Sequence, residues 1–128
     1  MALVLVVKFA ALSSLIEQGE WAAIVAAPLL ARAGAQALFL TTPYVRADGL
    51  GTAIAANLDR DRVLVALIVA LAVGAILIGV SAWLVLPLLV LVFYVVRAVM
   101  MRKLLGTTGD SAGGLIEILE AATLAFLA

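Results

Sequence analysis

Residues 63–96 read VLVALIVALAVGAILIGVSAWLVLPLLVLVFYVV, and this run of 34 uncharged positions decides the fold. A hydrocarbon layer of ~30 Å needs about 20 helical residues at ~1.5 Å per residue. The run is therefore too long for one crossing, and we expect two antiparallel helices. The small residues of 79–82, followed by Trp83, predict the reversal, with the tryptophan at the far membrane interface.

The composition of the whole chain indicates an integral membrane protein. Of the 128 residues, 67% are hydrophobic and 12% are charged, and the mean hydropathy is +1.31. A soluble domain is typically about half apolar and about a quarter charged. With further apolar segments at 2–16, 21–41 and 111–128, we expect an all-α, polytopic α-helical membrane protein with about five transmembrane helices. Residues 1–128 are predicted to form a single transmembrane helical domain.

The charge balance and the missing residue types exclude several classes of function. Eight basic and eight acidic residues give a net charge of zero, so no nucleic-acid partner is indicated. The chain has no Cys and no His, which removes disulfides, thiol chemistry, structural zinc and imidazole catalysis. Any chemistry has to use carboxylates, cations, hydroxyls or a metal held by oxygen ligands.

Two polar stretches, 42–62 and 97–110, flank the hairpin and therefore lie on the same side of the membrane. They hold six of the eight cationic residues, whereas the turn at 17–20 contains only glutamates as charged residues. Positive charge favours the cytoplasmic side. We expect both stretches to be cytoplasmic loops, and the cations concerned are Arg46, Arg60, Arg62, Arg97, Arg102 and Lys103.

Four charged residues fall inside the apolar segments. Lys8 and Arg32 lie in the first two segments at comparable depth, and Glu117 and Glu120 lie in the last one. Charges at membrane depth are costly, so we expect the four groups to meet. They form either ion pairs that hold the helices together or a polar cavity open to the cytoplasm. We favour phosphate binding for Arg32, because Arg forms planar bidentate contacts, and the role of Lys8 stays open.

The two loops carry candidate binding motifs. Tyr44 to Gly51, YVRADGLG, is a weak motif taken alone, and an interfacial turn explains it equally well. Gly106-Thr107-Thr108-Gly109-Asp110 precedes the last helix, whose N-terminal N–H groups favour an anion, although the P-loop spacing is absent. Asp110 is either the N-cap of a helix starting at Ser111 or a Mg²⁺ ligand beside a phosphate. Gly113 and Gly114 are expected to serve close helix packing.

Taken together, the motifs resemble those of the cobalamin synthase family, the adenosylcobinamide-GDP ribazoletransferases. Similar sequences carry Y-x-R-x-x-G-L-G and later R-x-L-G-G-x-T-G-D-x-x-G-A-x-I-E-x-x-E, with a lysine and an arginine corresponding to Lys8 and Arg32. The resemblance covers all 128 residues but only the C-terminal half of a family member, without the acidic D-G-x-x-D-x-x-D-G motif. Leu105 and Gly114 replace a usual Gly and a usual Ala.

The resemblance implies a reaction that joins adenosylcobinamide-GDP to α-ribazole or its 5′-phosphate and releases GMP. It implies Mg²⁺ as cofactor and a multi-pass location in the bacterial inner membrane. The alternatives are a catalytically incomplete membrane subunit that needs a separate acidic half, or a small membrane transporter. The expected partners are the two substrates, the lipid bilayer, and either a missing N-terminal half or further copies of the chain in a homo-oligomer. By resemblance, the catalytic residues are Asp110, Arg46 and Arg32, with Asp110 also on the metal, and the substrate-binding residues are Tyr44, Gly49, Gly51, Arg102, Thr108, Gly109, Glu117 and Lys8.

Overall fold

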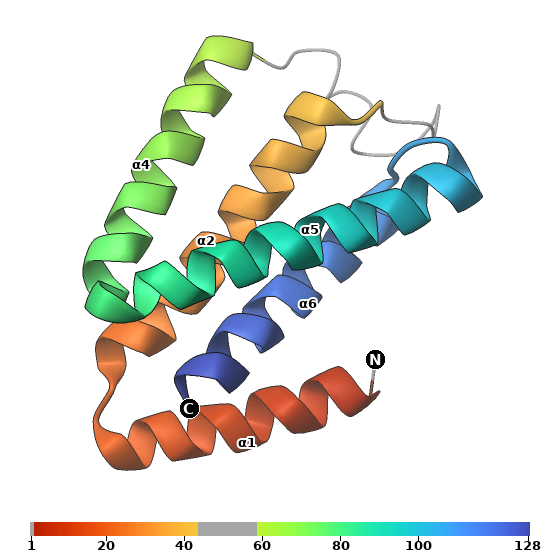
Figure 1. Ribbon diagram of the computed structural model, residues 1–128. Helices are drawn as coiled ribbons and strands as arrows, with labels where there is room; N and C mark the ends of the chain where they lie inside the picture. Colours follow the sequence, from red (N-terminus) through yellow and green to blue (C-terminus); the bar gives the residue numbers. More distant parts are fainter. Residues whose placement is uncertain (1, 44–58) are drawn as a thin grey trace.

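The chain folds into a bundle of α-helices, seen here in a computed structural model that describes residues 2–43 and 59–128. These residues contain no β-strand, so the all-α prediction is confirmed. The described elements, shown in Figure 1, are α1 (Ala2–Gln18), α2 (Trp21–Thr41), α4 (Arg60–Ile78), the 3-10 turn η1 (Gly79–Ser81), α5 (Ala82–Leu104) and α6 (Gly109–Leu127).

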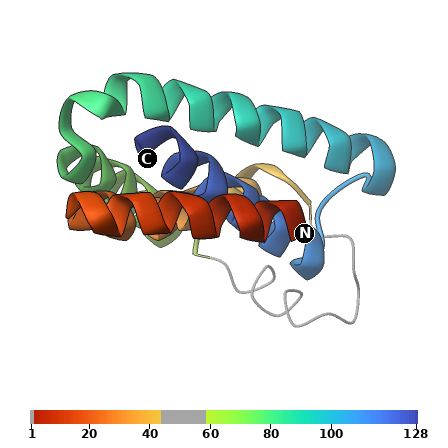
Figure 2. The same cartoon turned by 90° about the horizontal axis from the view of Figure 1, so that it is seen from below.

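Helices α2 and α6 form the centre of the bundle. Helix α2 packs against both α4 and α6, and α6 also contacts α1 and α5. Figure 2 shows α6 between α1 and α5 when the bundle is seen from below. Two neighbouring buried clusters follow from this arrangement, one around Leu30, Leu38 and Leu115 and the other around Leu15 and Leu124. The ends of α6 are therefore held from several sides.

The predicted hairpin is confirmed, with its reversal at η1. Helix α4 ends at Gly79, whose φ of +60° lies in the left-handed region that favours glycine. The Gly79 N–H donates to the Ala75 carbonyl and closes the last turn of α4. Helices α4 and α5 are thus joined at one end, and they diverge toward the other end (Figure 1).

Small residues allow the helices around α2 to approach closely. A Cβ added to Gly34 would collide with the Leu119 side chain of α6. At Gly74 of α4 the added Cβ would come within 2.5 Å of Leu30 Cδ2. By contrast, no described atom lies within 4 Å of a Cβ added to Gly113 or Gly114, so the packing role predicted for these two glycines is wrong.

Much of the outer surface is apolar. The Arg60–Leu104 stretch of 45 residues is long and apolar enough to cross a membrane. In its apolar segment of 18 residues, only 11% is buried inside the bundle. Helix α2 is also long and apolar enough. Helix α1 is shorter than these two stretches, with 17 residues, and α6 contains three acidic residues. Neither helix therefore combines enough length with few enough charges to count as a membrane-crossing candidate. The described residues therefore contain two apolar stretches that could cross a membrane. The number of about five transmembrane helices stays a prediction.

Helix α5 continues further than the charge pattern predicts. The second polar stretch was expected to be a loop over 97–110, but α5 extends to Leu104 and only residues 105–108 connect it to α6. Arg97, Arg102 and Lys103 therefore lie on a helix. The helix ends at Leu105, which has a left-handed φ of 58°. The resemblance described above implies a glycine at this position, and glycine is the residue best suited to that conformation.

Candidate phosphate-binding end

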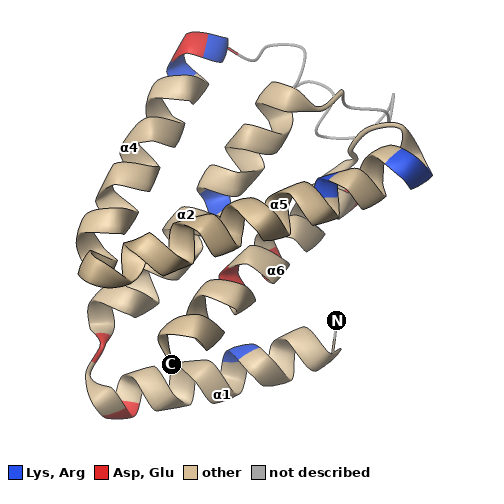
Figure 3. Cartoon of the chain, viewed as in Figure 1, with Lys and Arg blue, Asp and Glu red and all other residues tan. Residues whose placement is uncertain are grey.

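The end of α2, the start of α4, the end of α5 and the start of α6 lie at one end of the bundle (Figure 1). Figure 3 shows that the cationic residues of α4 and α5 concentrate there. The opposite end has Glu17 and Glu20 at the turn between α1 and α2. The arrangement agrees with the prediction that the two polar stretches share one side.

A backbone hydrogen bond joins the two stretches directly. The Thr107 N–H donates to the Pro43 carbonyl at 2.9 Å. Thr107 is fully buried, and its hydroxyl lies 3.0 Å from the Ser111 hydroxyl. Pro43 is the residue immediately before the motif 44–51. The chain therefore leaves α2 beside the Gly-Thr-Thr-Gly-Asp loop.

The first turn of α6 is capped by Thr108. The Thr108 hydroxyl accepts a hydrogen bond from Ser111 N at 3.2 Å, and Ser111 Oγ accepts one from Thr108 N at 2.8 Å. This reciprocal capping box fixes the start of the helix at Gly109, two residues before the predicted start. The N-cap role considered for Asp110 is therefore wrong. Asp110 lies exposed in the first turn, where the helix dipole favours negative charge.

Two arginines bind the C-terminal end of α2. Arg97 donates from Nη2 to the Thr41 carbonyl at 2.7 Å and from Nε to Thr42 Oγ1 at 2.9 Å. Arg60 donates to the Leu40 carbonyl at 3.2 Å. Cations are favourable beside the last carbonyls of a helix, so both contacts stabilise this end. Both arginines were predicted only to be loop cations; Arg97 directly follows the uncharged run, and Arg60 lies three residues before it.

The charges inside the bundle form a three-residue cluster. Lys8 Nζ lies 2.8 Å from Glu117 Oε2 and 3.2 Å from Glu120 Oε1, so α1 and α6 are joined by an ion-pair network. Arg32, which was expected to join this cluster, is exposed on α2 and forms no ion pair with any other described residue. Of the four groups expected to meet, three do. Glu117, a predicted substrate-binding residue, holds Lys8.

Arg32 is also remote from the loops along the helix axis. It precedes Thr42 by ten residues, which corresponds to about 15 Å at ~1.5 Å per residue. Arg102 is exposed in the last turn of α5, four residues before Gly106. The predicted site residues Tyr44, Arg46, Gly49 and Gly51 lie outside the described residues.

The acidic side chains of residues 2–43 and 59–128 are spread over several places in the bundle. These residues contain no group of three or more acidic, His or Cys side chains that could hold a metal ion. Glu117 and Glu120 pair with Lys8, and Asp110 is the carboxylate residue of the Gly-Thr-Thr-Gly-Asp loop. Protein-bound Mg²⁺ commonly uses one or two carboxylates together with substrate phosphates.

The sequence profile of one family, described as cobalamin-5-phosphate synthase, matches residues 1–128. The chain belongs to this family. It is 47% identical over its full length to the adenosylcobinamide-GDP ribazoletransferase of Stutzerimonas stutzeri strain A1501, of which it covers 52%. The enzymes of the same name from Pseudomonas fluorescens strain Pf0-1 and Pseudomonas syringae pv. tomato are 48% and 43% identical, and the chain covers 53% of each.

The chain thus spans about half the length of the curated relatives it matches, namely the C-terminal half. No solved structure matches it. Membership of the cobalamin-5-phosphate synthase family supports a role in cobalamin biosynthesis and confirms the resemblance read from the two motifs.

Proposed function

We propose that this chain supplies the phosphate-binding end of a membrane-embedded transferase that joins adenosylcobinamide-GDP to α-ribazole or its 5′-phosphate and releases GMP. The observation that carries the proposal is the hydrogen bond between Thr107 and Pro43, which joins the Gly-Thr-Thr-Gly-Asp loop to the residue that precedes the 44–51 motif, at the cationic end of the bundle. The relatives are ribazoletransferases by name, and this supplies the reaction class.

The residues at this end suit the transfer of a phosphoryl-linked group. A hydroxyl or phosphate of the ribazole attacks the cobinamide-linked phosphorus of the diphosphate, and GMP leaves with the electron pair of the broken P–O bond. Such reactions depend mainly on positioning and on stabilisation of negative charge. In our proposal Arg46 and Arg102 bind the phosphates, and the first turn of α6 binds one of them through its N–H groups.

Magnesium enters the proposal through Asp110 only. The ion would neutralise charge on the diphosphate when bound, and Asp110 would contribute one carboxylate to it. The remaining protein ligands would come from outside the described residues. In this arrangement Thr108 and Gly109 set the position of Asp110, because the capping box fixes the first turn of α6.

We further propose that the bundle is a multi-pass protein of the bacterial inner membrane with 42–62 and 97–110 on the cytoplasmic side. Helices α4 and α5 expose many apolar side chains. Contact of such a large apolar surface with water would be strongly unfavourable, so the surface supports embedding in lipid. The excess of cations at one end supports the orientation. Since Lys8, Glu117 and Glu120 pair with one another, these three charges do not favour the transporter over the transferase.

The chain covers half of its relatives, so activity is best tested in a chimera in which residues 1–128 replace the matching half of the Stutzerimonas stutzeri enzyme. We expect the chimera to release GMP from adenosylcobinamide-GDP in the presence of α-ribazole and Mg²⁺. The chain alone is expected to release none if it acts as one part of a two-part site. A chimera that reaches the membrane but never releases GMP would refute the proposal.

Asp110→Asn in the chimera tests the assigned site. We expect kcat to fall by about 10²–10³, the effect typical of losing one group that stabilises transition-state charge. Glu20→Gln is the matched control, because Glu20 also lies at a helix N-terminus but at the opposite end of the bundle. Equal activities of the two variants would remove Asp110 from the site.

A further inference from the structure

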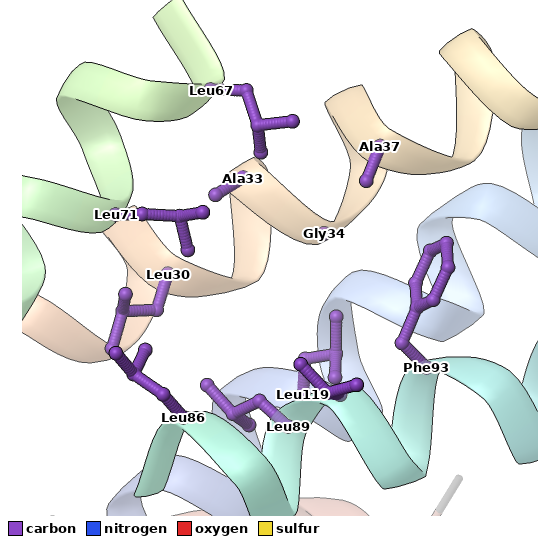
Figure 4. Close-up of a pocket in the computed structure, with 11 residues that line it drawn as sticks. Leu30, Ala33, Gly34, Ala37, Leu67, Leu71, Leu86, Leu89, Phe93 and Leu119 are labelled. Atoms are coloured by element: carbon purple, nitrogen blue, oxygen red, sulfur yellow. The ribbon is translucent and has the colours of Figure 1, made fainter. Parts of the chain in front are cut away.

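Helix α2 has one face that the other described helices leave exposed. The helix packs against α4 and α6, and its Leu30 and Ala33 line an apolar cavity shared with α4 and α5 (Figure 4). Before the last residue of α2, the exposed positions are Trp21, Val25 and Arg32. Positions four and seven apart share a face of a helix, so these three residues form one stripe. We call this stripe the outer face of α2.

Arg32 lies far from both ends of the helix. It is the eleventh residue after Trp21 and the ninth before Thr41, which corresponds to about 16 and about 14 Å along the axis at ~1.5 Å per residue. In the membrane embedding proposed above, this is close to the centre of a hydrocarbon layer of ~30 Å. Long cationic side chains reach the interface from positions near helix ends, and Arg32 is near neither end. Charged residues at such depth usually face other protein segments and pair there.

The part of the chain that the structure describes provides no partner for Arg32. The side chain forms no hydrogen bond or ion pair with these residues. The two glutamates within α6, Glu117 and Glu120, both pair with Lys8. Gln36 follows Arg32 by one helical turn, and its buried Oε1 has no hydrogen-bond partner among the described residues either. Two neighbouring polar side chains of α2 thus lack the partners that polar groups inside a membrane normally have.

The length of the relatives indicates where such a partner comes from. The chain covers 52% of the Stutzerimonas stutzeri enzyme and 53% of the Pseudomonas fluorescens Pf0-1 enzyme, as their C-terminal half. Each relative therefore has a further N-terminal half of similar length. From these observations we propose that the outer face of α2 docks a transmembrane helix of this N-terminal half, and that the docked helix carries a carboxylate that pairs with Arg32.

Other occupants fit the outer face less well. An acyl chain of a lipid offers only hydrocarbon at this depth and would leave the guanidinium unpaired. A second copy of the chain, related by a two-fold axis, would present the same patch and bring Arg32 against Arg32. A carboxylate instead matches the planar fork of the guanidinium. The inference rests on family membership and on the membrane embedding proposed above, but not on the transfer reaction.

The docking surface is tested by photo-crosslinking in the chimera introduced above, with a protease site added between its two halves. The photoreactive p-benzoylphenylalanine replaces Val25, which is 58% exposed on the outer face. The same replacement of Leu84 is the matched control, because Leu84 is 65% exposed near the start of α5. After illumination and proteolysis, crosslinked halves stay together in denaturing electrophoresis. We expect position 25 to join the two halves and position 84 to leave them separate.

A second pair of positions covers a failure of the Val25 variant to fold. Trp21 of the outer face and Trp83 of α5 are 62% and 83% exposed, and p-benzoylphenylalanine replaces one aromatic ring by another at both. Circular dichroism establishes that each variant is folded. A crosslink to a second copy, a crosslink to lipid alone, or equal joining from outer-face and control positions would overturn the proposal.

The ion-pair part is tested by the association of the two halves after proteolysis in mild detergent. Arg32→Met is expected to weaken this association by about tenfold, because a charge-assisted contact is lost. Arg32→Lys keeps the charge and should retain most of the association. Lys103→Met is the control, since Lys103 is an exposed cation in the last turn of α5. Equal association of the Arg32→Met and Lys103→Met chimeras would refute the pairing.

These readouts do not use GMP release, so the two proposals fail separately. A chimera that releases GMP but shows no crosslink from position 25 or 21 would overturn the docking surface alone. A chimera that forms both crosslinks but releases no GMP would count against the transfer reaction alone.

Discussion

Replacement of Lys8 by Met should destabilise the bundle through the two carboxylates that it leaves behind. At an effective dielectric constant of ~20, distances of 2.8 and 3.2 Å correspond to gross Coulomb energies of about 6 and about 5 kcal/mol. Desolvation of the charges offsets much of this, and the Lys8, Glu117 and Glu120 side chains are 15%, 37% and 20% exposed. We therefore expect a net loss of about 2–3 kcal/mol in the free energy of unfolding, slightly below the range for a fully buried pair.

If unpaired carboxylates cause the loss, removing their charges should rescue the bundle, whereas a loss caused by packing would remain. Converting Glu117 and Glu120 to Gln in the Lys8→Met background removes the unpaired charges and should restore most of the lost stability. Arg32→Met is the matched control for removing a cation from an apolar helix, and it should change stability by no more than about 0.5 kcal/mol. Urea unfolding in mild detergent, followed by circular dichroism, gives the free energies. Equal losses for Lys8→Met and Arg32→Met, or no rescue in the triple variant, would refute the assigned role.

Three further substitutions test the packing and the helix ends by the same unfolding measurement. Gly34→Ala should cost about 1–3 kcal/mol, because its methyl group collides with Leu119, whereas Gly113→Ala has open space and should be neutral or stabilising. A cost at Gly113 equal to that at Gly34 would contradict the packing. Leu105→Gly should raise the free energy of unfolding by about 1 kcal/mol, because it relieves a left-handed backbone, and Leu105→Ala should not raise it. If both variants were more stable, loss of the leucine side chain would be the cause instead. Arg97→Gln should cost about 2 kcal/mol through the two hydrogen bonds to the end of α2, and an unchanged stability would show that water replaces them.

The hairpin was predictable because its causes are local. A long uncharged run has to reverse within a membrane, and Gly79 supplies the backbone conformation for the reversal. The end of α5 was not predictable from charge, because a cation marks where a membrane segment ends and not where a helix ends. The helix continues from Arg97 through residues that favour helix, and it stops only where Leu105 takes a left-handed conformation.

The candidate site was predictable in part for a similar reason. Sequence position gives the depth of a residue along its helix, and this depth placed Lys8 near Glu117 and Glu120 correctly. The depth of a residue along its helix does not give the direction in which its side chain points. Arg32 has a suitable depth, but it is exposed on α2 and does not reach Glu117 or Glu120. The contact between Pro43 and Thr107 uses only backbone atoms, so no residue type signals it.

Helices α4 and α5 are connected by the short turn η1, and this bears on how the chain would enter the membrane proposed for it. The 45-residue stretch has its charged residues only within Arg60–Arg62 and from Arg97 onward, at the two ends that stay on one side in the proposed orientation. The part that travels across is the uncharged tip Gly79–Ser81 with its apolar neighbours. A charged residue at the centre of a membrane helix costs about 2.5–3.5 kcal/mol during insertion, and this hairpin avoids that penalty. Both helices can therefore enter the bilayer together, as one unit, with no polar segment to translocate.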